Sequence, residues 1–148
     1  MHRSNILKLL ILICFTIPAT ASAGDFDWLK DLDRQAKTDL SDFRVTIGTR
    51  FRIGDAQVKL VFSNVDKPAD SYMVLRLSEL SHRSVNDVLK VYKADHDKGW
   101  GVIAKHLGIK PGSREFHALK RGHDLAREEH RHEYKHGMKD KGNSKHKG

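Results

Sequence analysis

Apolar residues recur at spacings of three and four along most of the chain, and this periodicity limits the fold more than any other feature. The first series consists of Phe26, Leu29, Leu32, Ala36, Leu40, Phe43 and Ile47. On a helix such spacing places the apolar side chains on one face. The acidic residues between positions 25 and 33 suit the positive N-terminal end of a helix. The pattern predicts a first helix that starts at about residue 25.

Residues 68–126 carry similar apolar series, together with local signals for helix ends. Pro68 suits a first helical position, and Ser84 with Asp87 resembles a capping box. Gly108 stands where a left-handed C-terminal cap belongs, and Ser113 can cap a last helix. The apolar positions of these helices are Met73, Leu77, Leu80, Val85, Val88, Leu89, Tyr92, Trp100, Ile103, Ala104, Leu107, Phe116, Leu119 and Ala126. The sequence therefore predicts a mainly α fold, a small bundle of about five helices.

The segment 43–65 permits two interpretations. Its apolar residues alternate with polar ones at Phe43, Val45 and Ile47, and again at Val58 and Leu60, as in half-buried strands. A β-hairpin that turns at residues 54–55 therefore competes with helices here. Periodicity alone does not decide between them.

Residues 1–23 have the features of a secretory signal peptide. Basic residues precede the apolar run from Leu9 to Ile17, and Ala21-Ser22-Ala23 has the small-x-small pattern of a cleavage site. Cleavage would leave a mature chain that begins at Gly24 and has no cysteine, because Cys14 lies in the leader. We therefore expect a periplasmic or secreted protein with no transmembrane segment after cleavage.

The mature chain is expected to divide into a helical domain, residues 24–129, and a basic tail, residues 130–148. The net charge is +8 for the whole chain, and loss of Arg3 and Lys8 lowers it to about +6. From residue 130 the apolar spacing ends and His, Lys and Gly predominate, a composition that favours a frayed, partly disordered arm. A positive arm of this kind suits anionic partners such as lipid headgroups or polysaccharides.

Histidine is concentrated near the C-terminus, which raises the question of metal binding. His132 and His136 are four residues apart, so on a helix both imidazoles project from one face. Glu129 or Glu128 could add a carboxylate, giving a weak copper, nickel or zinc site. The alternative interpretation is a solvated helix end, where cationic side chains meet the negative end of the helix dipole.

Two further functions receive less support from the sequence. The segment 100–123 resembles a helix-turn-helix, but Pro111-Gly112 lengthens its turn and the signal peptide removes the protein from the nucleoid. We therefore expect no nucleic-acid partner. No Gly-x-Ser-x-Gly elbow, phosphate-binding loop or His-Glu-x-x-His motif is present, and no pattern assigns catalytic residues or a cofactor. The expected role is non-enzymatic.

The chain resembles a group of small exported bacterial proteins, mostly without assigned function. The resemblance covers roughly residues 40–123 and rests on Pro68-Ala69-Asp70 and on a block between Gly99 and Lys120 that reads GWGVIAK, LGIKPGS and EFHALK. It implies a helical extracytoplasmic domain and favours helices over the hairpin. Such relatives often carry a proline near the position of Gly54, where this chain differs. The resemblance identifies no catalytic residue.

The same block suggests where a protein partner could bind. Trp100 is the largest side chain in it and is expected to anchor the core. If it is exposed instead, Trp100, Phe116 and His117 could form a partner-binding surface. The sequence as a whole predicts an exported helical protein that binds an unknown protein or an anionic envelope surface.

Overall fold

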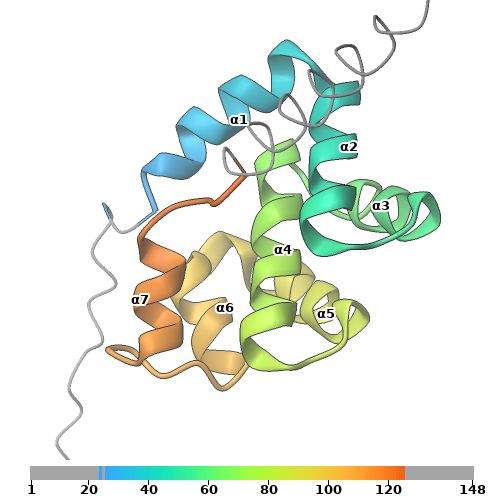
Figure 1. Ribbon diagram of the computed structural model, residues 1–148. Helices are drawn as coiled ribbons and strands as arrows, with labels where there is room; N and C mark the ends of the chain where they lie inside the picture. The colour runs from blue at the N-terminus through green and yellow to red at the C-terminus, as the bar shows by residue number, and fades with distance from the viewer. Residues whose placement is uncertain (1–23, 25, 126–148) are drawn as a thin grey trace, which may run out of the picture.

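The computed structural model describes Gly24 and residues 26–125, which form seven α-helices and one short 3-10 helix (Figure 1). The helices are α1 (Trp28–Thr38), α2 (Leu40–Phe51), α3 (Asp55–Phe62), α4 (Pro68–Ser81), α5 (Val85–Asp95), η1 (His96–Lys98), α6 (Trp100–His106) and α7 (Arg114–Lys120). The mainly α prediction is confirmed for this part of the chain, but the helices exceed the expected five. None of the helices in the described residues is long and apolar enough to cross a membrane.

Helix α4 runs through the middle of the molecule, and α1, α2, α3, α5 and α7 all contact it (Figure 1). Residues 71–75 of α4 are buried without interruption. Five consecutive residues span more than one turn of a helix, so this part of α4 has no solvent face and needs no polar stripe. Tyr72 is the largest fully buried side chain, and its ring makes edge contacts with Trp28 and Phe51 at 5.8 and 5.6 Å between ring centroids.

The apolar series from Phe26 to Ile47 is divided between two helices, one reason why the helix count is higher than predicted. Asp39 is extended, with φ −144° and ψ 92°, and its carboxylate accepts a hydrogen bond from the Asp42 backbone N–H at 2.9 Å. This cap ends α1 and starts α2 in a new direction. Leu40, which the pattern placed on the apolar face, is consequently exposed.

The hairpin alternative for residues 43–65 is wrong, because these residues form α2 and α3. Phe43 and Ile47 are four residues apart and are buried on one face of α2, whereas Val45 between them is 61% exposed. The apparent alternation therefore arises from two buried residues at helical spacing, Phe43 and Ile47, and an exposed apolar residue, Val45, that lies between them in sequence. Arg52 takes a left-handed conformation, φ 54° and ψ 44°, which ends α2 and lets α3 begin at Asp55.

The helix caps predicted from local sequence are confirmed. Ser84 and Ser113 accept hydrogen bonds from the backbone N–H groups of Asp87 and Phe116, each at 3.2 Å. Gly108 has φ 90°, and the following N–H, of Ile109, returns to the Ala104 carbonyl at 2.9 Å. A positive φ at this position closes the end of α6 and favours glycine.

Trp100 occupies a different place from the one predicted for it. Its side chain is half-buried at the margin of the core and stacks on Tyr92, with 5.4 Å between ring centroids. The central aromatic residue is Tyr72, in α4. Residue size is a poor guide to position in the core: α4 is central because five other helices pack against it, two of which flank it in sequence.

Candidate ligand-binding groove

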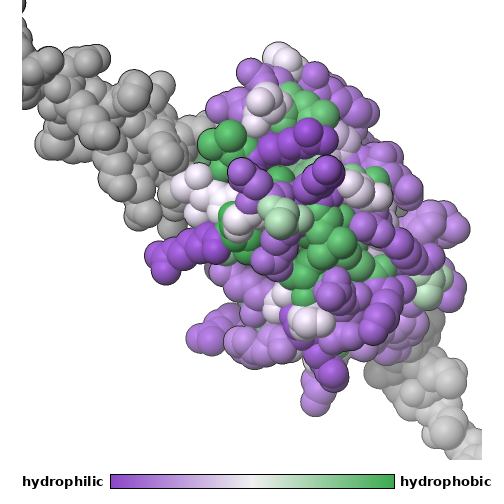
Figure 2. Space-filling view, turned by 90° about the vertical axis from the view of Figure 1, so that its right-hand side faces the viewer, coloured by the Kyte–Doolittle hydropathy of each residue, from purple (hydrophilic) through white to green (hydrophobic). Residues whose placement is uncertain are grey.

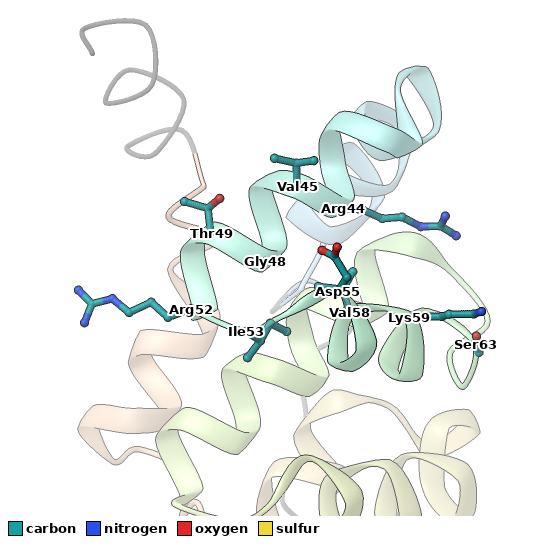
Figure 3. Close-up of a pocket in the computed structure, with 10 residues that line it drawn as sticks. All are labelled: Arg44, Val45, Gly48, Thr49, Arg52, Ile53, Asp55, Val58, Lys59 and Ser63. Atoms are coloured by element: carbon teal, nitrogen blue, oxygen red, sulfur yellow. The ribbon is translucent and has the colours of Figure 1, made fainter. Parts of the chain in front are cut away.

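A groove of about 660 Å³ lies between α2 and α3 (Figure 3). Its size falls within the range of small-molecule sites, which is roughly 300–1,000 Å³. The residues that line it are Arg44, Val45, Gly48, Thr49, Arg52, Ile53, Asp55, Val58, Lys59 and Ser63. They come from α2, α3 and the turn that joins these two helices, except Ser63, which directly follows α3.

Gly48 allows the two helices to approach closely at the floor of the groove. A Cβ atom at this position would lie 3.3 Å from Val58 Cγ2 and 3.4 Å from the Ile53 carbonyl oxygen. The Ile53 N–H also donates a hydrogen bond to the Gly48 carbonyl at 3.0 Å, which holds the turn against α2. A larger residue at position 48 would press on Val58 of α3 and on the Ile53 carbonyl in the turn, so glycine helps to set the shape of the groove.

The floor and one wall of the groove are apolar. Val58 is buried, Ile53 is half-buried, and Val45 is 61% exposed although it is a large aliphatic residue. Leu60, also on α3, is 41% exposed. Figure 2 views the molecule from the side on which α3 and α5 lie in Figure 1, and shows hydrophobic side chains gathered in the middle of this face, with hydrophilic side chains around them. Exposed apolar area inside a polar rim is typical of a binding surface.

The rim of the groove carries three cations. In Figure 3, Arg44 and Lys59 extend to one side of the groove and Arg52 extends to the opposite side. Within residues 26–125, no hydrogen bond or ion pair engages the charged ends of these three side chains. Arg44 makes one weaker contact, over the ring of Phe62 at 5.1 Å. The positive charge on this rim is therefore available to an anionic group.

Asp55 is the carboxylate that faces the groove, and it opposes anion binding. It starts α3, and in Figure 3 its side chain points from α3 toward α2. The rim thus combines three basic side chains with one acidic one. The hydroxyls of Thr49 and Ser63 also line the groove, but neither histidine nor cysteine is among its lining residues. The groove thus places basic, acidic and hydroxyl-bearing residues around an apolar floor, a combination able to bind a molecule with an anionic group and an apolar part.

The opposite side of α2 carries a compact polar cluster, which we name the Arg50 clamp: Arg50, Tyr72, Arg76, Glu79 and Asp124. Arg50 Nε and Nη2 lie 2.8 and 2.7 Å from the two carboxylate oxygens of Asp124, and Nη2 lies 3.2 Å from Glu79 Oε2. Arg76 also pairs with Glu79, and the Tyr72 hydroxyl donates to Asp124 Oδ1 at 3.1 Å. The clamp joins the chain after α7 to both α2 and α4.

The pKa values in the clamp are shifted in the directions that keep its charges paired. Burial would raise the pKa of the Asp124 carboxyl, but its hydrogen bonds and attraction to Arg50 outweigh burial and hold the pKa below the ordinary value. Glu79 shows the same balance, with Arg50 and Arg76 lowering its pKa against burial. Burial and the nearby Asp124 raise the pKa of the Tyr72 phenol. The clamp is a structural ion-pair network.

The residues predicted to bind a metal, His132, His136 and Glu129, lie outside the described residues, as do the signal peptide and the tail. Metal binding there stays a prediction. Among the residues that the structure does describe, no group of three or more His, Cys, Asp or Glu side chains could hold a metal ion.

The predicted partner-binding residues occupy unlike environments. Trp100 is half-buried against Tyr92, while Phe116 is buried and meets the edge of Phe26 at 6.5 Å between ring centroids. His117 is exposed on α7. Phe116 therefore supports the packing of α7 and offers little surface to a partner. Leu107 and Ile109, in the segment that resembles a helix-turn-helix, are also buried.

The groove was not predicted from the sequence, although a signal for it is present. Arg44 and Gly48 are four residues apart, so on a helix they lie on one face, roughly 100° around the axis from the buried Phe43 and Ile47. Arg52 follows at the same spacing, at the left-handed end of the helix. This stripe of two arginines and a glycine becomes visible only when residues 43–51 are taken as a helix. No protein family, curated protein or solved structure was found to match the chain.

Proposed function

We propose that this protein is an exported, non-enzymatic binding protein that associates with anionic surfaces of the cell envelope through the face formed by α2 and α3. The observation that carries the proposal is the set of three cations, Arg44, Arg52 and Lys59, that border exposed apolar area without an ion-pair partner among residues 26–125. Basic and apolar side chains together favour binding to anionic lipid surfaces. The basic residues of segment 130–148 add further positive charge.

Binding to lipid vesicles tests this proposal. The chain from Gly24 onward should sediment with vesicles that contain phosphatidylglycerol and should not sediment with pure phosphatidylcholine vesicles. Binding should weaken as salt rises, because salt screens the attraction between the rim and the headgroups. The double variant Arg44→Gln/Lys59→Gln should bind about 30-fold less at low salt, since each basic residue contributes ~1 kcal/mol near such a surface.

A matched control separates this face from net charge. Arg83 and Lys105 are exposed, lie away from the groove, and have no side-chain hydrogen bond or ion pair within the part of the chain that the structure describes. The variant Arg83→Gln/Lys105→Gln loses the same charge and should keep most of the vesicle binding. Equal weakening by both double variants would contradict a role for the α2–α3 face.

Export is a separate part of the proposal and has its own test. Expression of the whole chain in a Gram-negative host should yield a periplasmic or secreted product whose N-terminal residue is Gly24. This follows from the apolar run and the Ala-Ser-Ala sequence before residue 24. A cytoplasmic product that retains Met1 would contradict the export part of the proposal and would leave the binding part to the vesicle experiment.

A further inference from the structure

The groove has a feature that binding to headgroups alone does not require: an apolar floor below the cations. Lipid headgroups at a membrane surface need only basic side chains. Val58 is buried on α3 beside Gly48 of α2, and Ile53 is half-buried in the turn between the helices, so an alkyl group reaches them only by entering the groove. We propose that the groove binds a single-chain anionic amphiphile, with a carboxylate or phosphate head and an alkyl chain of medium length. This inference deepens the proposed function and rests on the same groove.

The geometry indicates how such a molecule lies. Arg44 and Lys59 extend to the same side of the groove, one from α2 and one from α3 (Figure 3). They can hold the head between them, and the planar guanidinium can donate two parallel hydrogen bonds to a carboxylate or phosphate. From that end the floor continues past Val58 to Ile53 at the turn. Positions 44 and 52 are about 12 Å apart along a helix, which sets the length available to the alkyl chain.

Charge argues against the two other occupants that the groove could have. The C-terminal segment of the same chain is rich in Lys after residue 130, so it would place positive charge on a positive rim. A second copy that docked by a two-fold axis would bring the same face, with the same Arg44 and Lys59, against itself. An anionic amphiphile matches both properties of the groove, the cationic rim and the apolar floor.

The test is calorimetric titration of the chain from Gly24 onward with octanoate, decanoate, dodecanoate and dodecyl phosphate, each below its micelle concentration. Affinity should rise with chain length, by about fourfold for each methylene that becomes fully buried. Dodecyltrimethylammonium, which has the same chain and a cationic head, should not bind. Equal affinity for octanoate and dodecanoate would overturn the inference, because it would mean that only the head is held.

Three variants locate the binding site. Arg44→Gln/Lys59→Gln should lower the affinity for dodecanoate at least tenfold, and Arg83→Gln/Lys105→Gln should leave it unchanged. Asp55→Asn should raise the affinity severalfold, because it removes the carboxylate that faces the groove. Melting temperatures of all variants are measured alongside, since these exposed positions should tolerate substitution. Unchanged affinity in the Arg44/Lys59 variant would overturn the assignment.

The outcome also separates this inference from the proposed function. Binding to anionic vesicles without binding of free amphiphiles would overturn the inference and keep the envelope proposal. Binding of amphiphiles with the predicted chain-length dependence, but without vesicle binding, would support the inference and contradict association with membrane surfaces. Free anionic amphiphiles and bilayer headgroups are thereby distinguished as sources of the ligand.

Discussion

Two arginines of α2, Arg50 and Arg44, show how differently one helix uses the same residue type. Arg50 has a side chain only 15% exposed and is held by the carboxylates of Asp124 and Glu79. Arg44 is exposed and pairs with no acidic group among the described residues. The charge of Arg50 is paired, and these ion pairs connect segments that are distant in sequence. The charge of Arg44, on the other side of the helix, has no acidic partner among the described residues and is available to a ligand. We therefore propose that stability and binding belong to opposite sides of α2.

The largest effect that separates the two sides is expected from Tyr72→Ala. Tyr72 is 1% exposed and contacts the rings of Trp28 and Phe51 as well as Asp124. Its loss should lower the free energy of unfolding by about 4 kcal/mol, from lost burial and the cavity left behind. Val45→Ala, on the groove side, should cost less than about 0.5 kcal/mol, because Val45 is exposed. Urea denaturation measures both, and similar losses would contradict the division.

Removal of the clamp arginine should have the next largest effect. Arg50→Gln leaves Asp124 and Glu79 without their main partner, and should lower the free energy of unfolding by about 2 kcal/mol. Arg44→Gln should change it by less than about 0.5 kcal/mol, since Gln is a good helix former and Arg44 contributes to no ion pair within the described part of the chain. The same denaturation experiment would refute the structural role of the clamp if Arg50→Gln proved as stable as wild type.

Acid should weaken the clamp side selectively. The ordinary pKa values of Asp124 and Glu79 are 3.8 and 4.5, and both are lowered in the folded protein. Groups with lowered pKa stabilise the fold above those ordinary values, and the contribution is lost as pH falls through the folded values. Thermal melts between about pH 6 and pH 2.5 should therefore show a steeper loss below about pH 4 in wild type than in Asp124→Asn. Parallel pH profiles for the two proteins would argue against the clamp.

The smallest effect concerns the turn beside the groove. Arg52 has φ 54° and His82 has φ 55°, a region that glycine enters without steric cost. Arg52→Gly and His82→Gly should therefore leave stability unchanged or raise it by up to about 1 kcal/mol. A clear loss of stability in Arg52→Gly, with none in His82→Gly, would mean that the Arg52 side chain serves the fold and not the rim.

Local features of this fold could be predicted from sequence, and long-range ones could not. Ser84, Ser113 and Gly108 act on backbone groups within a few residues, so their motifs sufficed. The spacing of Phe43, Val45 and Ile47 fits both a strand and a helix, and packing against α4 decides between them. The clamp joins positions 50, 79 and 124, a combination that no local pattern indicates. Prediction of the groove likewise required residues 43–51 to be recognised as a helix, because only on a helix do Arg44 and Gly48 lie on one face.

The most direct test of the division of α2 is titration of dodecanoate into wild type, Arg50→Gln and Arg44→Gln at a temperature where all three are folded. The account predicts that Arg50→Gln binds like wild type despite its lower melting temperature. Arg44→Gln should keep the wild-type melting temperature and bind severalfold more weakly. The reverse pattern, weaker binding by Arg50→Gln and unchanged binding by Arg44→Gln, would contradict the account.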